Sequence, residues 1–133
     1  YRLLGLNPAH APLTSFTIAM AEPETMADQA REARLPIYKI KVGGAQDVAA
    51  VAAIRAVSPA RLRVDANAGW SREQAAALIP QLADYDLELV EQPLPVGDIE
   101  GLRWLKAQNL GLPIFADESI KTNPAYLMPV STY

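Results

Sequence analysis

One structural unit repeats along this chain: a short apolar run of strand type is followed by a longer stretch with helical spacing. Strand-like runs are expected at Ser15 to Met20, Ile37 to Val42, Leu62 to Asp65, Leu87 to Glu91 and Ile114 to Ala116. Regular alternation of strands and helices is typical of a parallel sheet whose strands are joined by crossover helices. The sequence therefore predicts an α/β fold.

The stretches between these strands are expected to be helices, at Glu24 to Leu35, Gln46 to Val57, Arg72 to Asp84 and Asp98 to Gln108. The third helix has the clearest start, because Ser71 followed three residues later by Gln74 is a capping-box pattern. Pro23 suits the opening turn of the first helix, since the backbone N–H that proline lacks would have no helical partner there.

Composition excludes several classes of protein. The 133 residues carry a formal net charge of -3 and half of them are hydrophobic, which suits one globular domain and not a nucleic-acid-binding module with clustered basic residues. The chain has no Cys, so it has no disulfide, thiolate metal site or Cys nucleophile. No apolar run approaches the roughly 18 residues that span a bilayer. We expect a cytoplasmic protein that binds neither nucleic acid nor membrane.

Chemically active side chains recur at the carboxyl ends of the expected strands. The positions Thr17, Lys41, Asp65, Glu91 and Asp117 are separated by 24, 24, 26 and 26 residues. Because parallel strands bring their carboxyl ends to one edge of the sheet, this edge is where α/β folds place their sites. Three carboxylates on neighbouring strands need a compensating cation, and oxygen ligands suit Mg²⁺. The spacing therefore predicts a magnesium site formed by the three acids.

Two lysines flank Ile40 in an otherwise apolar strand. The alternation of side chains along a strand directs Lys39 and Lys41 to the same face. Two ammonium groups in one partly desolvated space lower each other's affinity for a proton, which makes an amine available as a base near neutral pH. The pair is therefore a candidate for acid/base chemistry beside the three acids.

Four motifs resemble those of the enolase superfamily, specifically its muconate-lactonizing subgroup: Lys39-Ile40-Lys41, Asp65-Ala66-Asn67, Glu91-Gln92-Pro93 and Asp117-Glu118-Ser119. The resemblance covers nearly the whole chain. It implies part of a (β/α)₈ TIM-type barrel that follows a capping domain, with Lys-x-Lys on the second strand and metal ligands ending the third, fourth and fifth strands.

The resemblance also implies roles for individual residues. Mg²⁺ would be bound by Asp65, Glu91 and Asp117, with Lys41 as the acid/base and Lys39 as its electrostatic neighbour. Further residues are candidates for contact with the substrate or for support of the site: Thr14, Thr17, Asn67, Gln92 and Glu118. Glu118 is a secondary candidate, because it should point elsewhere if the strand geometry continues past Asp117.

The activity that the resemblance implies is that of a racemase or epimerase. Lys41 would take a proton next to the carboxylate of a small substrate, while Mg²⁺ offsets the charge that develops on the carboxylate oxygens. Within the subgroup, the segments 3–6, 14–17 and 39–44 look most like those of dipeptide epimerases of the L-Ala-D/L-Glu type. Muconate cycloisomerase and o-succinylbenzoate synthase, of the same subgroup, are the alternatives.

The resemblance divides the chain into a linker from a missing capping domain (1–13), a partial barrel domain with the first five strands (14–121) and an irregular C-terminal tail (122–133). The family uses another lysine, on a sixth strand, for reprotonation. We therefore expect that the chain alone is not a competent epimerase. Five strands in an open arrangement would also leave an unpaired edge on each side, which favours oligomerisation or association with another fragment.

Two hypotheses that assign the chain to other classes of protein remain open at this point. A complete doubly wound domain of the receiver or flavodoxin type would act in signalling or binding, and its strand order 2-1-3-4-5 would separate Lys41 from Asp65. A barrel segment would make these two residues neighbours. The second hypothesis is that the chain is a non-catalytic, metal-stabilised scaffold.

Overall fold

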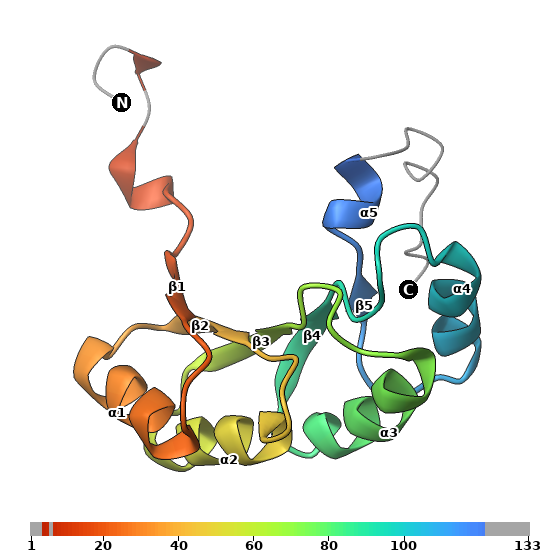
Figure 1. Ribbon diagram of the computed structural model, residues 1–133. Coiled ribbons are helices and arrows are strands. Elements are labelled where there is room, and N and C mark those ends of the chain that lie inside the picture. Colours follow the sequence, from red (N-terminus) through yellow and green to blue (C-terminus); the bar gives the residue numbers. More distant parts are fainter. Residues whose placement is uncertain (1–3, 6, 122–133) are drawn as a thin grey trace.

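The structure, a computed structural model, describes residues 4–5 and 7–121 and contains one parallel sheet (Figure 1). Its strands are β1 (Ser15–Ile18), β2 (Ile37–Lys41), β3 (Arg61–Asp65), β4 (Leu87–Glu91) and β5 (Ile114–Phe115). They lie side by side in the order of the sequence, and every neighbouring pair is parallel. The α/β prediction is confirmed, whereas the doubly wound alternative is wrong because β2 lies directly beside β3.

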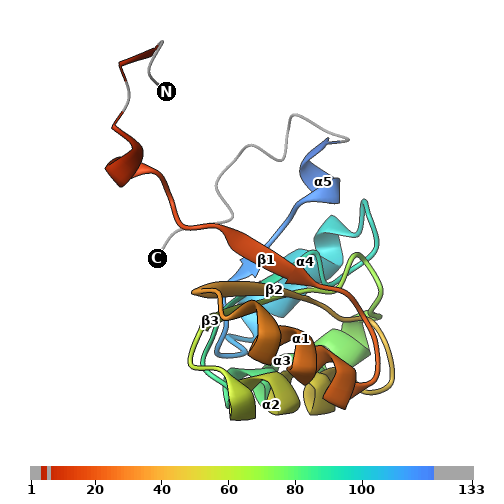
Figure 2. The ribbon, with the colours of Figure 1, turned by 90° about the vertical axis from the view of Figure 1, so that its left-hand side faces the viewer.

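The helices follow the strands one by one. They are α1 (Pro23–Ala33), α2 (Asp47–Val57), α3 (Arg72–Ala83), α4 (Ile99–Ala107) and the short α5 (Glu118–Lys121), preceded by the 3₁₀ turn η2 (Pro8–His10). Helices α1, α2 and α3 lie beneath the sheet, and α1 packs on α2, α2 on α3 and α3 on α4 (Figures 1 and 2). The boundaries predicted for the five strands and four long helices are each within two residues of the observed ones.

The hydrophobic core lies between the sheet and these helices. Alternate strand residues are buried against the helices, among them Ile18, Ile40, Leu62, Val64 and Val90. Tyr38 is also fully buried, and its hydroxyl donates to the Ala30 carbonyl at 2.8 Å and accepts from the Leu35 N–H at 2.9 Å. One face of the sheet is thus committed to packing, as the period of two along a strand requires.

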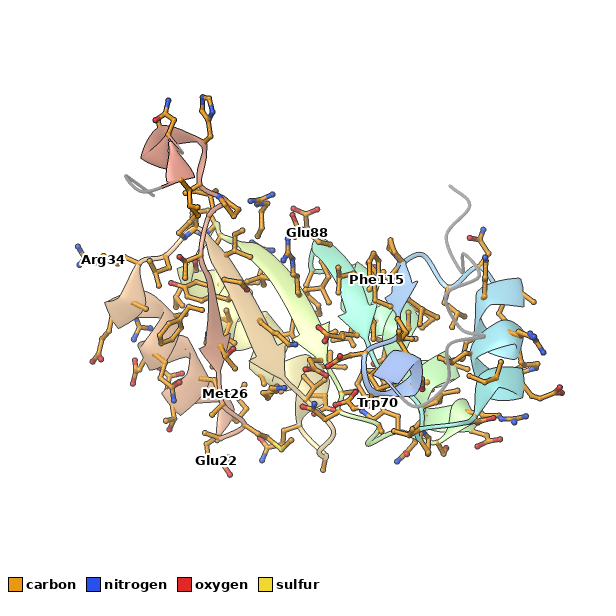
Figure 3. The ribbon with its side chains drawn as sticks, turned by 90° about the horizontal axis from the view of Figure 1, so that it is seen from above. Glu22, Met26, Arg34, Trp70, Glu88 and Phe115 are labelled. Atoms are coloured by element: carbon orange, nitrogen blue, oxygen red, sulfur yellow. The ribbon has the colours of Figure 1, made fainter. Side chains whose placement is uncertain are left out.

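The other face of the sheet carries charged side chains, and Figure 3 looks onto it. The strand registers place Lys41, Asp65, Glu91 and Phe115 in one row at the carboxyl end. At the opposite end of β3 and β4, Glu88 pairs with Arg63 at 2.6 Å and with Arg61 at 3.2 Å. In the described part of the chain, β1 and β5 form the edges of the sheet. Association through these edges stays a prediction.

Parts of the sequence-based prediction lie outside the described residues. The C-terminal tail at 122–133 is one of these parts, as are positions 1–3 and 6 of the expected linker. Within the described residues, no helix has the length and apolar character needed to cross a membrane.

Side-chain caps set the starts of two helices. The predicted capping box of α3 is present, since the Ser71 hydroxyl accepts from the Gln74 N–H and the Gln74 side chain accepts from the Ser71 N–H. At the start of α4 the Asp98 carboxylate accepts from the Gly101 N–H at 3.0 Å and forms an ion pair with Arg72. This ion pair joins the start of α3 to the start of α4.

Replacement of Asp98 tests this junction. We expect Asp98→Ala to lower the free energy of unfolding by about 1–2 kcal/mol, because both the cap and the ion pair are lost. Asp98→Asn keeps an acceptor for Gly101 and should cost less than about 1 kcal/mol. Glu100→Gln, at an exposed carboxylate of the same helix, is the control. Urea unfolding measures all three variants.

The effect should depend on pH. Arg72 holds the pKa of the Asp98 carboxyl below its usual range. The stabilisation by the ion pair is therefore fully present above the pKa of the unfolded chain and is lost as the pH falls through the lower pKa of the folded chain. The difference between wild type and Asp98→Asn should shrink between about pH 7 and about pH 2. A difference that is constant over this range would contradict the assignment.

Candidate active site at the carboxyl end of the sheet

The residues selected by their spacing lie at one end of the sheet. Lys41, Asp65 and Glu91 are the last residues of β2, β3 and β4 and are paired in register. Asp117 follows the end of β5 by two residues. Thr17 pairs in register with Lys39. The topology thus brings residues that are far apart in the sequence onto neighbouring strands.

Asp65 is at the centre of the site. Its side chain is 1% exposed, and its Oδ2 atom accepts from Lys41 Nζ at 2.6 Å and from Lys39 Nζ at 2.9 Å. Its Oδ1 atom accepts from the Asn67 backbone N–H at 3.0 Å. Burial raises the pKa of the Asp65 carboxyl, but the hydrogen bonds from Lys41, Lys39 and Asn67 outweigh burial and hold that pKa below its ordinary value. Asp65 is therefore a buried carboxylate anion held by two cations.

Lys39 joins Asp65 to Glu91. Its Nζ atom lies 2.9 Å from Glu91 Oε1 and 2.8 Å from Glu91 Oε2, in addition to its contact with Asp65. Burial lowers the pKa of Lys39, but the hydrogen bonds to Glu91 and Asp65 outweigh burial and raise that pKa above its usual value. The expectation that Lys41 would weaken the hold of Lys39 on its proton is wrong, because two carboxylates contact the Lys39 ammonium group directly.

Lys41 is the second cation of the cluster and has a different set of partners. Besides Asp65, its Nζ atom donates to Asn67 Oδ1 at 2.7 Å. Asn67 has a φ of 46°, in the left-handed region that asparagine tolerates better than most residues, and this turn directs its amide back towards β2. Lys41 is thus held by the carboxylate of Asp65, the last residue of β3, and by the amide of Asn67 in the loop that follows.

Glu118 also reaches this cluster. It is the first residue of α5, and its Oε1 atom accepts from Asn67 Nδ2 at 3.2 Å. Strand β5 ends at Phe115, so the condition under which this side chain would point elsewhere, a strand that continues past Asp117, is not met. Its other oxygen, Oε2, is buried without a hydrogen-bond partner. A buried carboxylate oxygen without a partner is costly and suits a site that receives a further donor or a cation.

Gln92 supports the site from below. Its fully buried side chain accepts from the Asp117 N–H at 2.9 Å and the Ser119 N–H at 3.2 Å. It donates to the Leu94 carbonyl and to Ser119 Oγ, each at 2.8 Å. The amide therefore fixes the backbone turn that carries Asp117. Thr14, just before β1, and Thr17 are exposed at the other side of the site.

Asp47 is a further buried acid near the site, at a position that the spacing of the strand ends does not single out. This buried carboxylate accepts from the N–H groups of Gly43 and Gly44 at 2.9–3.0 Å and from Trp70 Nε1 at 2.8 Å. It thereby ties the loop after β2 to the loop after β3. The signal in the sequence is an acid at the first position of a helix that closely follows two glycines, a pattern that allows backbone N–H groups to converge on a carboxylate.

The predicted magnesium ligands have the chemistry of a hard-cation site. Asp65 and Glu91 already share one cation, the Lys39 ammonium group. Asp117 follows the end of the next strand, β5, and the residue after it is Glu118, whose Oε2 atom has no hydrogen-bond partner. Among the described residues, no three His, Asp or Glu side chains gather as a ready metal-binding group. The residue types fit Mg²⁺, whose ligands in proteins are oxygens, and ligation by Asp65, Glu91 and Asp117 stays a prediction.

Comparison with known proteins identifies the fold family. Residues 24–130 match the family described as Enolase C-terminal domain-like. The chain belongs to this family. The predicted resemblance to the enolase superfamily is thereby confirmed, and so is the partial TIM-type barrel, because the solved structures that it resembles are TIM-barrel enzymes of that superfamily.

Three relatives of this enolase-type chain are informative. An L-Ala-D/L-amino acid epimerase of Maribacter sp. is 41% identical over 119 residues, which cover 90% of this chain and 35% of the relative. A hydrophobic dipeptide epimerase of Enterococcus faecalis is 42% identical over 126 residues, covering 90% of this chain and 35% of the relative. The crystal structure of a dipeptide epimerase from Cytophaga hutchinsonii, complexed with Mg and D-Ala-L-Val, superimposes with a TM-score of 0.79 at 33% identity, covering 89% and 34% of the two chains.

The chain therefore spans about a third of the length of these relatives. The part that matches the family, residues 24–130, contains Lys39, Lys41 and the three acids.

A double-mutant cycle tests the link between Lys39 and Glu91. We expect Lys39→Met to lower the free energy of unfolding by about 1–3 kcal/mol, because it leaves two neighbouring carboxylates without their shared cation. Lys39→Met combined with Glu91→Gln should recover part of this loss, since one of the two negative charges is then gone. Lys106→Met, at an exposed lysine of α4, is the matched control. Additive effects of the two site substitutions in urea unfolding would contradict the shared-cation geometry.

Proposed function

We propose that this chain provides the acid/base lysine and the metal-binding edge of a Mg²⁺-dependent dipeptide epimerase, which abstracts a proton next to the substrate carboxylate. The observation that carries the proposal is the contact of Lys41 Nζ with Asp65 Oδ2 at 2.6 Å. It joins a lysine, the residue type that the family uses as base, to the first of three acids on consecutive strand ends. The relatives that are named as epimerases support the choice of reaction.

The chemistry at Lys41 follows from its surroundings. As a neutral amine, Nζ accepts the proton from the substrate carbon next to the carboxylate, and as an ammonium group it can return that proton. Asp65 and Asn67 hold Nζ in place in both directions, since each offers an acceptor within 2.7 Å. The position of the amine is thus set before the substrate binds, and this lowers the entropic part of the activation barrier for proton transfer.

Lys39 has a different task. Its raised pKa keeps it charged near neutral pH, so it contributes a positive charge near the place where negative charge develops on the substrate. Bound Mg²⁺, with Asp65, Glu91 and Asp117 as its ligands, would supply a Lewis acid for the substrate carboxylate. Gln92 would keep Asp117 in position through the backbone turn.

Muconate cycloisomerase and o-succinylbenzoate synthase activities remain the alternatives within the subgroup. All three activities include the transfer of a proton to or from the carbon next to a carboxylate, so the cluster at Lys41 suits each of them. The dipeptide assignment is supported by relatives that are named for dipeptides and match about nine tenths of this chain.

Isotope exchange tests the reaction. We expect the chain with Mg²⁺ in D₂O to incorporate deuterium at the carbon next to the carboxylate of L-Ala-L-Glu or L-Leu-L-Leu, as followed by NMR. Lys41→Met should reduce this rate by at least about 100-fold, the usual contribution of a general base. Lys106→Met should leave the rate unchanged, and removal of Mg²⁺ with a chelator should abolish exchange.

Exchange and inversion are measured separately, because the chain spans about a third of the length of its relatives. Undiminished exchange by Lys41→Met, or no exchange with any dipeptide at saturating Mg²⁺, would contradict the proposal.

A further inference from the structure

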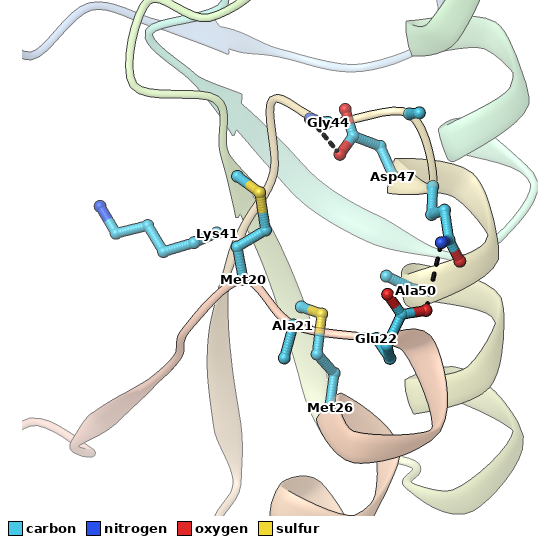
Figure 4. Close-up of a pocket in the computed structure, with 10 residues that line it drawn as sticks. Met20, Ala21, Glu22, Met26, Lys41, Gly44, Asp47 and Ala50 are labelled. Carbon is cyan, nitrogen blue, oxygen red and sulfur yellow. Dashed lines mark hydrogen bonds between the residues drawn. The ribbon is translucent and has the colours of Figure 1, made fainter.

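The ammonium group of Lys41 is held from the side of β3. Lys41 borders a hollow of about 300 Å³ between the β1–α1 loop and the start of α2, but its ammonium group points away from this hollow (Figure 4). Its Nζ atom donates to Asp65 Oδ2 at 2.6 Å and to Asn67 Oδ1 at 2.7 Å. Asp65 Oδ2 also accepts from Lys39. In the described part of the chain, Asn67 Oδ1 is therefore the acceptor that Lys41 does not share with a second lysine.

The orientation of the Asn67 amide matters for a base at Lys41. A side-chain amide carries an oxygen and an NH₂ group of similar size, so a half-turn exchanges an acceptor for a donor. With the oxygen towards Nζ, as here, the amide only accepts from Lys41. After a half-turn, Asn67 Nδ2 would donate to the lone pair of the neutral amine, and this lone pair is needed to take the substrate proton. The proposed reaction therefore requires Asn67 in one of its two orientations.

Glu118 is placed to select this orientation. Asn67 is exposed, and water both donates and accepts, so contact with solvent favours neither orientation. An ionised carboxylate only accepts. Because Glu118 Oε1 lies 3.2 Å from Asn67 Nδ2, the contact forms only when the NH₂ group faces Glu118 and the oxygen faces Lys41.

The stability of the fold does not explain a glutamate at this position. The backbone on both sides of Glu118 is held by the buried Gln92, whose Oε1 atom accepts from the N–H groups of Asp117 and Ser119 at 2.9 Å and 3.2 Å. Glu118 Oε2 is buried without a hydrogen-bond partner among the described residues, which destabilises the folded chain. The contact of the other oxygen with Asn67 is thus what this carboxylate contributes to the site.

We infer that Glu118 is a positioning residue, which fixes the Asn67 amide with its oxygen towards Lys41 and so keeps the lone pair of the neutral amine free for the substrate proton. The inference rests on the proposed function, because the lone pair matters only if Lys41 is the base. The neutral amine then donates its two N–H groups to Asp65 and Asn67, and its lone pair points away from both. Glu118 itself neither gives nor takes a proton in this role.

NMR on the full chain labelled with ¹³C and ¹⁵N tests the contact. Scalar couplings across a hydrogen bond connect the donor nitrogen with the carbon that carries the acceptor oxygen. We expect a coupling between Asn67 Nδ2 and Glu118 Cδ in the wild type and also in Lys41→Met. Lys41→Met has no donor at position 41, so the orientation of the amide is then set without the lysine.

Deuterium exchange with L-Ala-L-Glu and Mg²⁺ tests the link to the reaction. Glu118→Leu should lower the rate about tenfold through kcat and not KM, because the reacting group is then held less precisely. In an Asn67→Gly background the same substitution should have no further effect, since no amide is left to fix and glycine tolerates the φ of 46°. Glu100→Leu, at an exposed glutamate of α4, should leave the rate unchanged.

Urea unfolding separates positioning from a structural role. Glu118→Leu should leave the free energy of unfolding unchanged or raise it, because it removes a buried oxygen without a partner. Four results would each overturn the inference: no coupling in the wild type, loss of the coupling in Lys41→Met, equal rate losses by Glu118→Leu in both backgrounds, or a lower free energy of unfolding alongside the lost rate.

Failure of the proposed function gives a different outcome. Couplings present in the wild type and in Lys41→Met, with no deuterium exchange, would support the fixed amide and remove the epimerase proposal. Exchange that depends on Lys41 and is undiminished in Glu118→Leu would keep the epimerase proposal and overturn the role of Glu118.

Discussion

The site depends on one oxygen atom of Asp65, which accepts hydrogen bonds from two lysine ammonium groups. A buried carboxylate is stable only when cations and N–H donors replace the water that it has lost. Lys39 and Lys41 provide this replacement, and because Lys39 also binds Glu91, the same charge balance extends to the next strand. The charges at the carboxyl end of the sheet therefore form one connected network in which the loss of one member affects the others.

The sheet makes this network possible. Tyr38 and Ile40 are fully buried against the helices, and strand alternation then directs Lys39 and Lys41 to the uncovered face. The in-register pairing of β2, β3 and β4 places Lys41, Asp65 and Glu91 in one row. The same residues at a register shifted by one position would point into the apolar layer, where the energetic cost of their charges would prevent folding. The packing of the core and the position of the site are thus set by the same alternation.

The sequence predicted the regular elements well because each has a local signal, such as the capping box at Ser71 or the apolar run that ends at Asp65. It predicted which residues lie at the carboxyl end of the sheet, because a repeat of nearly constant length, 24 to 26 residues, keeps them in phase. It did not predict the charge state of Lys39, the approach of Glu118 to Asn67 or the role of Asp47. These depend on which side chains meet across loops from different units, and spacing along the chain carries no information about such contacts.

The central claim is that Asp65, Glu91 and Asp117 bind one divalent ion next to Lys41. The most direct measurement is a crystal structure of the chain grown with Mn²⁺ as an anomalously scattering substitute for Mg²⁺. We expect a single anomalous peak within about 2.0–2.3 Å of oxygens from all three carboxylates, with the Lys39 ammonium group displaced from its position between Asp65 and Glu91. A peak elsewhere, or a well-ordered Lys39 still joining the two carboxylates at saturating Mn²⁺ with no peak among the three acids, would contradict it.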